Sequence, residues 1–231
     1  MSKGPIAFLT LAATLLLFAT SVCAQSSEDT SLKSELLRLA HDWEHVKLRI
    51  IDRDDQERQM AGLAQRAAKI AEQYENVPDP IVWIGIITSE QASLANESGS
   101  PLKALELAKQ ARDILETVER ADPATMDAGA PTTLGLLYDR VPGFPISFGD
   151  KAKARNYLQE AVRNAPNGLD ANYFYGDFLY RQGEQAEAIK VLEHALTLPE
   201  LANRPNWDRS LRVDIRKVLS KLQKGARTPD K

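Results

Sequence analysis

The feature that most constrains the fold is a recurring set of small residues. Three times along the chain, a glycine is followed by two alanines seven residues apart. The glycines are Gly85, Gly135 and Gly176, and the alanine pairs are Ala104/Ala111, Ala154/Ala161 and Ala188/Ala195. Seven residues make two helical turns, so each alanine pair lies on one face of a helix and lets the preceding helix pack closely. The pattern predicts an all-α solenoid of antiparallel helix hairpins, a fold class that favours binding over catalysis.

Four hairpins and a terminal helix are expected from the apolar periodicity. The hairpins span about 31–76, 80–121, 127–165 and 169–199, the C-terminal capping helix spans 206–224, and the tail at 225–231 is expected to be disordered. Residues 31–224 would then form one helical-repeat domain. A terminal helix needs a polar outer face, for which Arg209, Arg212, Arg216 and Lys217 are suited.

The spacing within the hairpins is not uniform. From glycine to first alanine it is 12 residues in the last hairpin and 19 in each of the two before it. The sequence therefore predicts the same insertion of seven residues between the helices of the second and third hairpins. In the third hairpin the inserted loop is Val141–Gly149, which contains Pro142 and Pro145. Asp150, which follows the loop, is expected to cap the next helix.

The N-terminus has the pattern of an export signal. Lys3 precedes an apolar run of about 14 residues, from Ile6 to Ala19, which suits a signal peptide and is short for a membrane-spanning helix. Cleavage after Ala24 is predicted, which would remove residues 1–24, leave 25–30 as a flexible N-terminus and place the protein in the periplasm. The alternative is a lipoprotein acylated at Cys23, the one case in which we expect membrane contact.

Composition argues against several classes of function. The formal net charge is −3, and the basic tail is short, so no nucleic-acid partner is expected. Cys23 is the only cysteine, which excludes disulfides and thiolate metal sites once the signal is cleaved. The sequence has no phosphate-binding loop and no Ser–His–Asp arrangement, and no cofactor is predicted.

The last hairpin resembles the tetratricopeptide repeat (TPR). Gly176, Ala188 and Ala195 are spaced by 12 and 7 residues, as in that repeat. The hairpin departs from the repeat at Asn172, where tryptophan is usual, and at Glu200, where the closing proline is expected. The resemblance implies a right-handed solenoid whose first helices line a concave groove for a protein partner.

A narrower resemblance covers residues 132–198. The stretches 137–150 and 173–179, together with Lys153-Ala154, are similar to exported proteins related to the T-component of TRAP transporters. In that family a periplasmic helical-repeat protein associates with a solute-binding protein. The resemblance implies a protein partner, either that component or another envelope protein, and it brings no catalytic residues. A homo-oligomer is also compatible with it.

Candidate partner-binding residues follow from these patterns. The groove positions on the first helices of the third and fourth hairpins are Thr132, Leu136, Asp139, Arg140, Asp170, Tyr173, Asp177, Tyr180 and Arg181. Aromatic residues beside Asp and Arg suit an extended peptide or a helix. Phe144 and Phe148 on the stiffened loop are candidate hot spots. The alternatives are that both phenylalanines fold back onto the protein and that Tyr173 and Tyr180 belong to the core.

Two other functions stay open at this point. His41, Glu44 and His45 match H-x-x-E-H, in which two histidines bind zinc and a glutamate acts as base, so a zinc-dependent hydrolase is one alternative. With three fixed residues the motif is commonly matched by chance, and we expect no metal site. Binding of a small ligand in the groove is the other alternative.

Overall fold

The computed structural model describes residues 11–201 and 204–226 of the chain, which divides into two units, residues 1–38 and 39–231. In the first unit the described backbone is helical from Leu11, as the first part of α1 (Leu11–Arg49). This helix runs through residues 25–30, expected to be flexible; the segment contains neither glycine nor proline to break it. Among the described residues, no helix combines the length and the apolar character needed to cross a membrane. The predicted cleavage after Ala24 stays a prediction, and residues 1–10 and 227–231 lie outside the described part.

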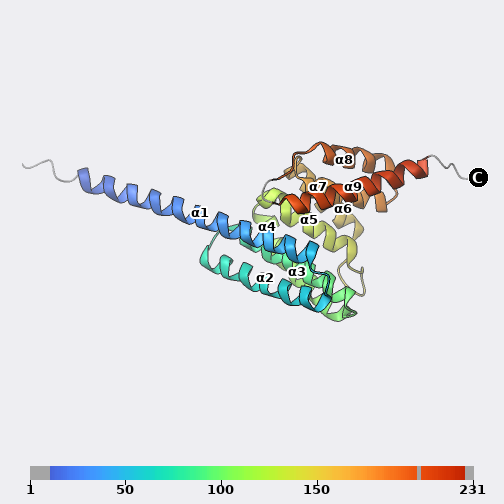
Figure 1. Cartoon of the computed structure of the whole chain (residues 1–231), viewed down its shortest axis with the longest axis horizontal. Coiled ribbons are helices and arrows are strands. Elements are labelled where there is room, and N and C mark those ends of the chain that lie inside the picture. The colour runs from blue at the N-terminus through green and yellow to red at the C-terminus, as the bar shows by residue number, and fades with distance from the viewer. Residues whose placement is uncertain (1–10, 202–203, 227–231) are drawn as a thin grey trace, which may run out of the picture. The chain divides into compact units, whose positions relative to one another are not determined.

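The second unit consists of helices joined by short connections (Figure 1). After the end of α1 come α2 (Arg53–Gln73), α3 (Pro78–Glu97), α4 (Pro101–Ala121), α5 (Thr125–Arg140), α6 (Lys151–Asn164), α7 (Leu169–Arg181), α8 (Gln185–Thr197) and α9 (Pro205–Ala226). Across the described residues there is no β-strand, and Gly143 and Gly149 form an isolated bridge. The predicted all-α class is confirmed.

Aspartates determine where two of these helices begin. The Asp150 carboxylate accepts a hydrogen bond from the Lys153 backbone N–H at 3.1 Å, so it is the N-cap of α6, as expected. Asp52 has the same role for α2, because its carboxylate accepts from the Asp55 backbone N–H at 2.8 Å. Each cap satisfies backbone donors that a helix leaves without partners at its start.

The repeated glycines lie where the two helices of a hairpin touch. Each glycine on a first helix faces a leucine on the second, and the pairs are Gly85–Leu115, Gly135–Leu158 and Gly176–Leu192. A Cβ atom on any of these glycines would lie 2.4–2.5 Å from a side-chain carbon of its leucine. Real Cβ atoms do not approach so closely, so the helices pack at this distance because the side chain is absent.

The spacing of these pairs corrects the predicted insertions. The paired residues are 16 positions apart in the last hairpin, 23 in the third and 30 in the second, so the insertions are 7 and 14 residues long and not the same. In the third hairpin the extra residues lie in loop 141–150. In the second they lie in the helices, because α3 and α4 have 20 and 21 residues where α7 and α8 have 13 each. Ala111, rather than Ala104, therefore corresponds to Ala154.

The hairpins stack in chain order within this unit. α3 and α4 contact α5, α5 and α6 contact α7, and α7 and α8 contact α9, while α2 packs along α3. One apolar cluster joins the stacked hairpins, and it includes Val82, Leu115, Leu134, Leu158 and Phe178, each at most 1% exposed. The predicted stack of helix hairpins is thereby confirmed.

The start of α5 contains a left-handed turn. Met126, Asp127 and Ala128 have φ angles of 52°, 52° and 59°, and Pro131 follows one turn later. Left-handed backbone costs L-residues about 1–2 kcal/mol each, so the surrounding packing must hold this turn in place. Ala128 is fully buried, which is consistent with such packing.

The last helix packs its apolar face onto the stack and differs from prediction at one residue. Leu211, Ile215 and Leu222 are buried, and α9 contacts α7 and α8. Arg212, expected on the polar outer face, is buried instead. Its guanidinium donates to the carbonyl oxygens of Leu196, at 3.1 Å, and Leu198 at the end of α8. A cation there stabilises the carbonyls that a helix leaves without partners at its C-terminus.

Candidate functional site

An ion-pair network links α5 to α7. Both oxygens of the fully buried Asp139 carboxylate are engaged, one by Lys151 Nζ at 2.7 Å and the other by the Arg181 guanidinium. Arg181 Nε also donates to Asp177 at 3.0 Å. Burial on its own would raise the pKa of Asp139, but the hydrogen bonds from Lys151 and Arg181 outweigh it and hold that pKa below its usual value. Three of the predicted groove residues are therefore brought together, and they bind one another.

Tyr173 lies at the centre of charges that come from three helices. Its hydroxyl is in the electrostatic range of Asp177 and Arg181 on α7, Arg140 on α5 and Asp214 on α9. Burial, followed by the two nearby aspartates, raises the pKa of Tyr173 to about 12, so the phenol is neutral at physiological pH. The ring packs against Phe174 with 4.9 Å between ring centroids. We call these five residues, Arg140, Tyr173, Asp177, Arg181 and Asp214, the Tyr173 surface.

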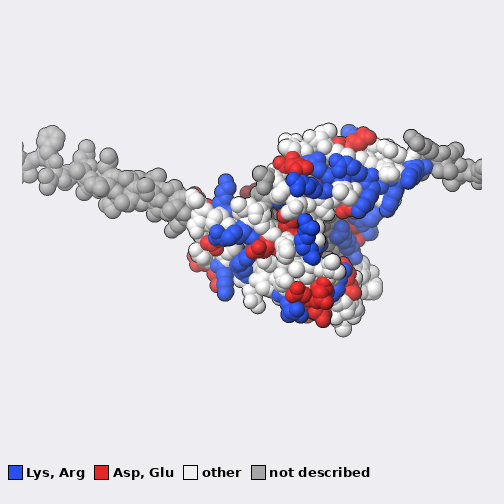
Figure 2. Space-filling model, viewed as in Figure 1, with Lys and Arg blue, Asp and Glu red and all other residues white. Residues whose placement is uncertain are grey.

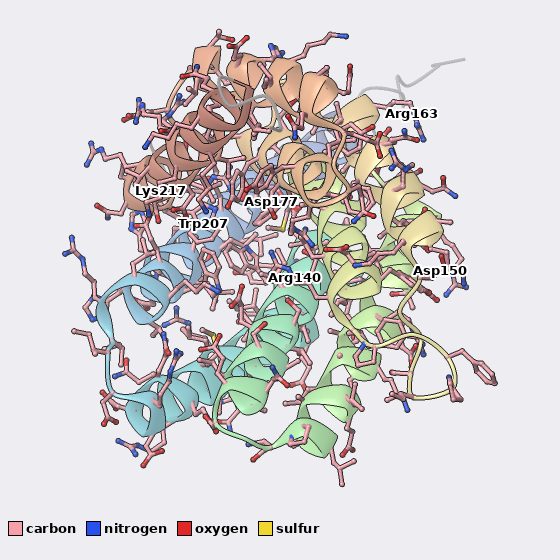
Figure 3. The ribbon with its side chains drawn as sticks, turned by 90° about the vertical axis from the view of Figure 1, so that its right-hand side faces the viewer. Arg140, Asp150, Arg163, Asp177, Trp207 and Lys217 are labelled. Atoms are coloured by element: carbon pink, nitrogen blue, oxygen red, sulfur yellow. The ribbon has the colours of Figure 1, made fainter. Side chains whose placement is uncertain are left out.

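The contribution of α9 to this surface was missed by the sequence reasoning, which treated α9 only as a cap. Asp214 forms an ion pair with Lys217 at 2.9 Å. In Figure 3, Arg140 and Asp177 lie near the middle of the view and Lys217 at its left, whereas Asp150 and Arg163, at the two ends of α6, lie at the right-hand edge. Only the packing of α9 on α7 brings Asp214 within electrostatic range of Tyr173, and no sequence spacing encodes that proximity.

The other predicted groove residues have different environments. Asp170 accepts a hydrogen bond from Trp207 Nε1 at 2.7 Å and forms an ion pair with Arg204, so it fastens the start of α9. Thr132 is buried, with 4% of its surface exposed. Leu136 and Tyr180 are half-buried, and Arg140 is exposed. Of these, Arg140 and Tyr180 offer the most accessible polar atoms.

The loop between α5 and α6 has a closed base. The Gly149 N–H donates to Pro142 O at 2.9 Å, the Asp150 N–H donates to Tyr138 O at 2.8 Å, and the Ile146 N–H donates to Gly143 O at 3.1 Å. A Cβ atom on Gly149 would lie 1.8 Å from the carbonyl oxygen of Val141, so the chain can close here only through glycine. The loop is therefore held in one shape by its own backbone.

The two loop phenylalanines have opposite environments. Phe144 is 94% exposed, and Ile146 beside it is 67% exposed. Phe148 folds back, with its ring 5.2 Å from that of Tyr138 and the Arg112 guanidinium 4.5 Å above it. We call Phe144 and Ile146 the loop tip. Ile146 was not among the residues predicted from the sequence, although its place two residues after Phe144 on a stiff loop was a usable signal.

Glu44, the expected base of a zinc site, has a structural role. It is 4% exposed, and its carboxylate accepts hydrogen bonds from the Trp207 backbone N–H and, at 2.9 Å, from Asn206 Nδ2. Both oxygens are thus used to hold the N-terminus of α9, while His41 and His45 are exposed. The described residues contain no group of three or more His, Cys, Asp or Glu side chains that could hold a metal ion.

Aromatic rings strengthen the same junction. The ring of Trp43 lies 4.8 Å from that of Trp207 and 5.8 Å from that of Trp83, in edge-to-face geometry. Such pairs stabilise beyond the burial of their area. The last turns of α1 therefore connect α3 to the start of α9.

A small hollow lies elsewhere, between α1 and α2. It has a volume of about 260 Å³ and is lined by Asp42, His45, Val46, Gln59, Gly62, Leu63 and Arg66. None of the predicted groove residues lines it, and Arg66 and Asp42 form an ion pair across it at 2.7 Å. Pockets for small molecules are usually about 300–1,000 Å³, so this hollow is below that range.

Comparisons with known proteins agree with this fold. Residues 169–200, which comprise α7 and α8, match the tetratricopeptide repeat family. No match was found among curated protein sequences. The chain is similar in structure to TTC0263, a thermophilic TPR protein in Thermus thermophilus, with 17% identity, 73% of this chain and 75% of that chain covered, and a TM-score of 0.50.

Two further solved structures are similar over most of their length. A MamA RS-1 ArsTM double mutant has 19% identity, covers 70% of this chain and 93% of its own, and gives a TM-score of 0.33. The de novo designed helical repeat protein DHR64 has 20% identity, covers 85% of this chain and 100% of its own, and gives a TM-score of 0.36. Residues 169–200 thus match one tetratricopeptide repeat, and the chain shares its helical fold with TTC0263.

Proposed function

We propose that this chain is a non-enzymatic scaffold that binds another protein. The observation that carries the proposal is the loop tip, where Phe144 is 94% and Ile146 67% exposed on a loop closed by its own hydrogen bonds. A large apolar side chain that is already fixed loses little entropy on binding, and such residues dominate binding energy at protein interfaces.

The Tyr173 surface is the second proposed contact. It contains the half-buried Tyr173 and the exposed Arg140, and the half-buried Tyr180 lies two turns further along α7. The network of Asp139, Arg181 and Asp177 underneath holds α5 and α7 together. A firm base with aromatic and polar groups above it suits an extended peptide or a helix of a partner. The repeat fold supports this role because TPR-like solenoids present surfaces of this kind.

The proposed setting is the bacterial periplasm. The apolar run before Ala24 supports export, and the similarity of residues 132–198 to TRAP T-component relatives supports a solute-binding protein as the partner. Catalysis by a zinc-bound motif has no support in the arrangement around Glu44, because its carboxylate is engaged by α9.

A capture experiment with matched variants tests the proposal. The protein is immobilised and exposed to a periplasmic extract, and the bound proteins are identified by mass spectrometry. Phe144→Ala/Ile146→Ala tests the loop tip, and Arg140→Ala/Tyr180→Ala tests the Tyr173 surface together with Tyr180 beyond it on α7. Leu102→Ala, at a residue that is 83% exposed on α4, is the control for loss of an exposed apolar side chain.

We expect the parent chain and Leu102→Ala to capture the same protein in similar amounts. Both double variants should capture at least tenfold less of it. If all four proteins capture the same set in the same amounts, the assigned surfaces are wrong. Capture of a solute-binding protein would support a role beside a transporter. Capture of a different envelope protein would support the scaffold proposal and contradict the proposed transporter partner.

A further inference from the structure

The solvent-facing side of α9 carries cations and no exposed anion. Arg209, Arg216, Lys217, Lys221 and Lys224 are exposed, and we call these five residues the basic face. The two acidic residues of the helix lie elsewhere, since Asp208 is fully buried and Asp214 is half-buried. Figure 2 shows Lys and Arg gathered along α9, although the chain as a whole has a formal net charge of −3. The positive charge is therefore concentrated at one place.

Folding does not require this concentration. Arg209 forms an ion pair with Glu200 at 3.8 Å and Lys217 forms one with Asp214 at 2.9 Å, but within the described part of the chain no acidic side chain forms an ion pair with Arg216 or Lys221. Lys217 and Lys221 are four positions apart, a spacing at which like charges repel on a helix. Side chains of mixed sign would solvate the outer side of α9 equally well. The single sign therefore points to an anionic partner.

The geometry favours a flat partner. The spacing of the five residues places them on one side of a straight helix, in a row about 22 Å long. Val213, which is 48% exposed, is the one large apolar side chain among them. Protein interfaces are depleted in lysine and centre on aromatic or arginine hot spots, whereas phospholipid headgroups attract rows of lysine and arginine.

We infer that the basic face of α9 docks on an anionic phospholipid surface. The contact is electrostatic and reversible, because Val213 alone gives little apolar insertion, and it weakens with salt as the screening length shortens. It does not require acylation of Cys23, and it does not involve the loop tip or the Tyr173 surface. Export, as predicted from the N-terminus, would place the chain beside such a surface.

Vesicle co-sedimentation tests the inference. The protein purified from its natural host is mixed with vesicles of equal parts phosphatidylcholine and phosphatidylglycerol, or with vesicles of phosphatidylcholine alone. Arg209→Gln/Arg216→Gln/Lys221→Gln removes three cations from the basic face. Lys69→Gln/Lys109→Gln/Arg163→Gln removes three cations from α2, α4 and α6 and changes the net charge equally. All proteins carry the same N-terminus, and circular dichroism melting verifies their folds.

Each phospholipid-facing cation is expected to contribute about fivefold, so the α9 variant should bind anionic vesicles about 100-fold more weakly than the parent. The control should bind like the parent, and neutral vesicles should show no difference between the proteins. An equal loss of vesicle binding in both triple variants would overturn the inference. Binding of the parent to neutral vesicles as strongly as to anionic vesicles would overturn it too. Binding to polyglutamate or to duplex DNA at the same salt without binding to anionic vesicles would also overturn it, in favour of an acidic macromolecule.

Discussion

The Trp207 backbone N–H at the start of α9 donates to the Glu44 carboxylate on α1, although 163 residues separate the two in sequence. Glu44 therefore acts as an N-cap supplied from outside the helix that it caps. A carboxylate at this place satisfies a backbone donor and interacts favourably with the helix dipole.

Removal of this carboxylate should destabilise the protein. Glu44→Ala leaves the buried Trp207 N–H without an acceptor, which costs about 1–3 kcal/mol of unfolding free energy. Urea denaturation followed by tryptophan fluorescence measures the loss. His45→Ala changes the exposed neighbour and should stay within about 0.5 kcal/mol of the parent. Equal losses in the two variants would contradict the assigned role of Glu44.

The close approach of α7 and α8 at Gly176 and Leu192 predicts a second effect. Gly176→Ala places a Cβ atom 2.5 Å from Leu192 and should lower the unfolding free energy by about 1–3 kcal/mol through overpacking. Gly62→Ala on α2 is the control, because a Cβ atom added there would meet no other atom within 4 Å. That control should gain about 0.5–1 kcal/mol, since alanine favours helix more than glycine does. A stable Gly176→Ala protein would show that the helices can separate without cost.

Glu119 predicts a loss of stability with rising pH. Burial, followed by the neighbouring Glu160 carboxyl, raises the pKa of Glu119 above its usual value in the folded protein. The folded state therefore favours protonated Glu119. The contribution of this group to the free energy of unfolding is fully present below the pKa that Glu119 has in the unfolded chain, and it is lost as pH rises through its pKa in the folded protein. Glu119→Gln, which stays neutral, should raise the unfolding free energy at neutral pH and remove this slope. Glu106→Gln, at an exposed position of α4, should leave the slope unchanged.

Asp139 predicts the opposite dependence. Burial opposes ionisation of Asp139, but Lys151 and Arg181 lower the pKa of Asp139 in the folded protein. The stabilisation from the ionised carboxylate is therefore fully present above the pKa of Asp139 in the unfolded chain, and it is lost as pH falls through its pKa in the folded protein. Asp139→Asn should lower the unfolding free energy by about 1–3 kcal/mol at neutral pH, less than for a fully buried pair because Lys151 and Arg181 are partly exposed. The difference from the parent should shrink in acid. A constant difference across pH would show that the ion pairs are not its cause.

The loop between α5 and α6 predicts a separation of folding from binding. Phe148→Ala removes a ring packed on Tyr138 and should cost about 1–3 kcal/mol of unfolding free energy. Phe144→Ala, at a side chain that is 94% exposed, should change it by less than about 0.5 kcal/mol. Thermal unfolding of the two variants measures both effects. A large loss for Phe144→Ala would mean that the loop tip serves the fold rather than a partner.

The fold class was predictable from sequence because small residues leave a regular trace. Gly135 and Gly176 must lack a side chain where two helices touch, and their spacing to the following alanines reports the hairpin. The 14-residue insertion in the second hairpin was misread because Ala104 and Ala111 lie on the same helical face. Periodicity shows which face of a helix a residue occupies but not its position along the helix axis, so Ala104 was aligned with Ala154 in place of Ala111.

The site was only partly predictable, because its key contacts are distant in sequence. Asp139, Tyr173, Asp177 and Arg181 were identified as groove positions, but the ion pair between Asp139 and Arg181 depends on how α5 and α7 stack. Asp214 reaches Tyr173 only through the packing of α9. The net charge of −3 was read as evidence against a nucleic-acid partner, but it is an average that conceals the basic face. Distribution in space, rather than composition, determines what such a chain attracts.

The lengthened second hairpin has a consequence for how this architecture can vary. α3 and α4 exceed α7 and α8 by seven and eight residues, which is about one heptad per helix. A heptad returns a helix to nearly the same orientation, with a drift of only about 20°. Arms of such a hairpin can therefore grow or shrink in matched heptads while the same side chains face the core. Repeats of unequal height are thus compatible with one continuous stack, and hairpin length becomes a modular variable in this chain.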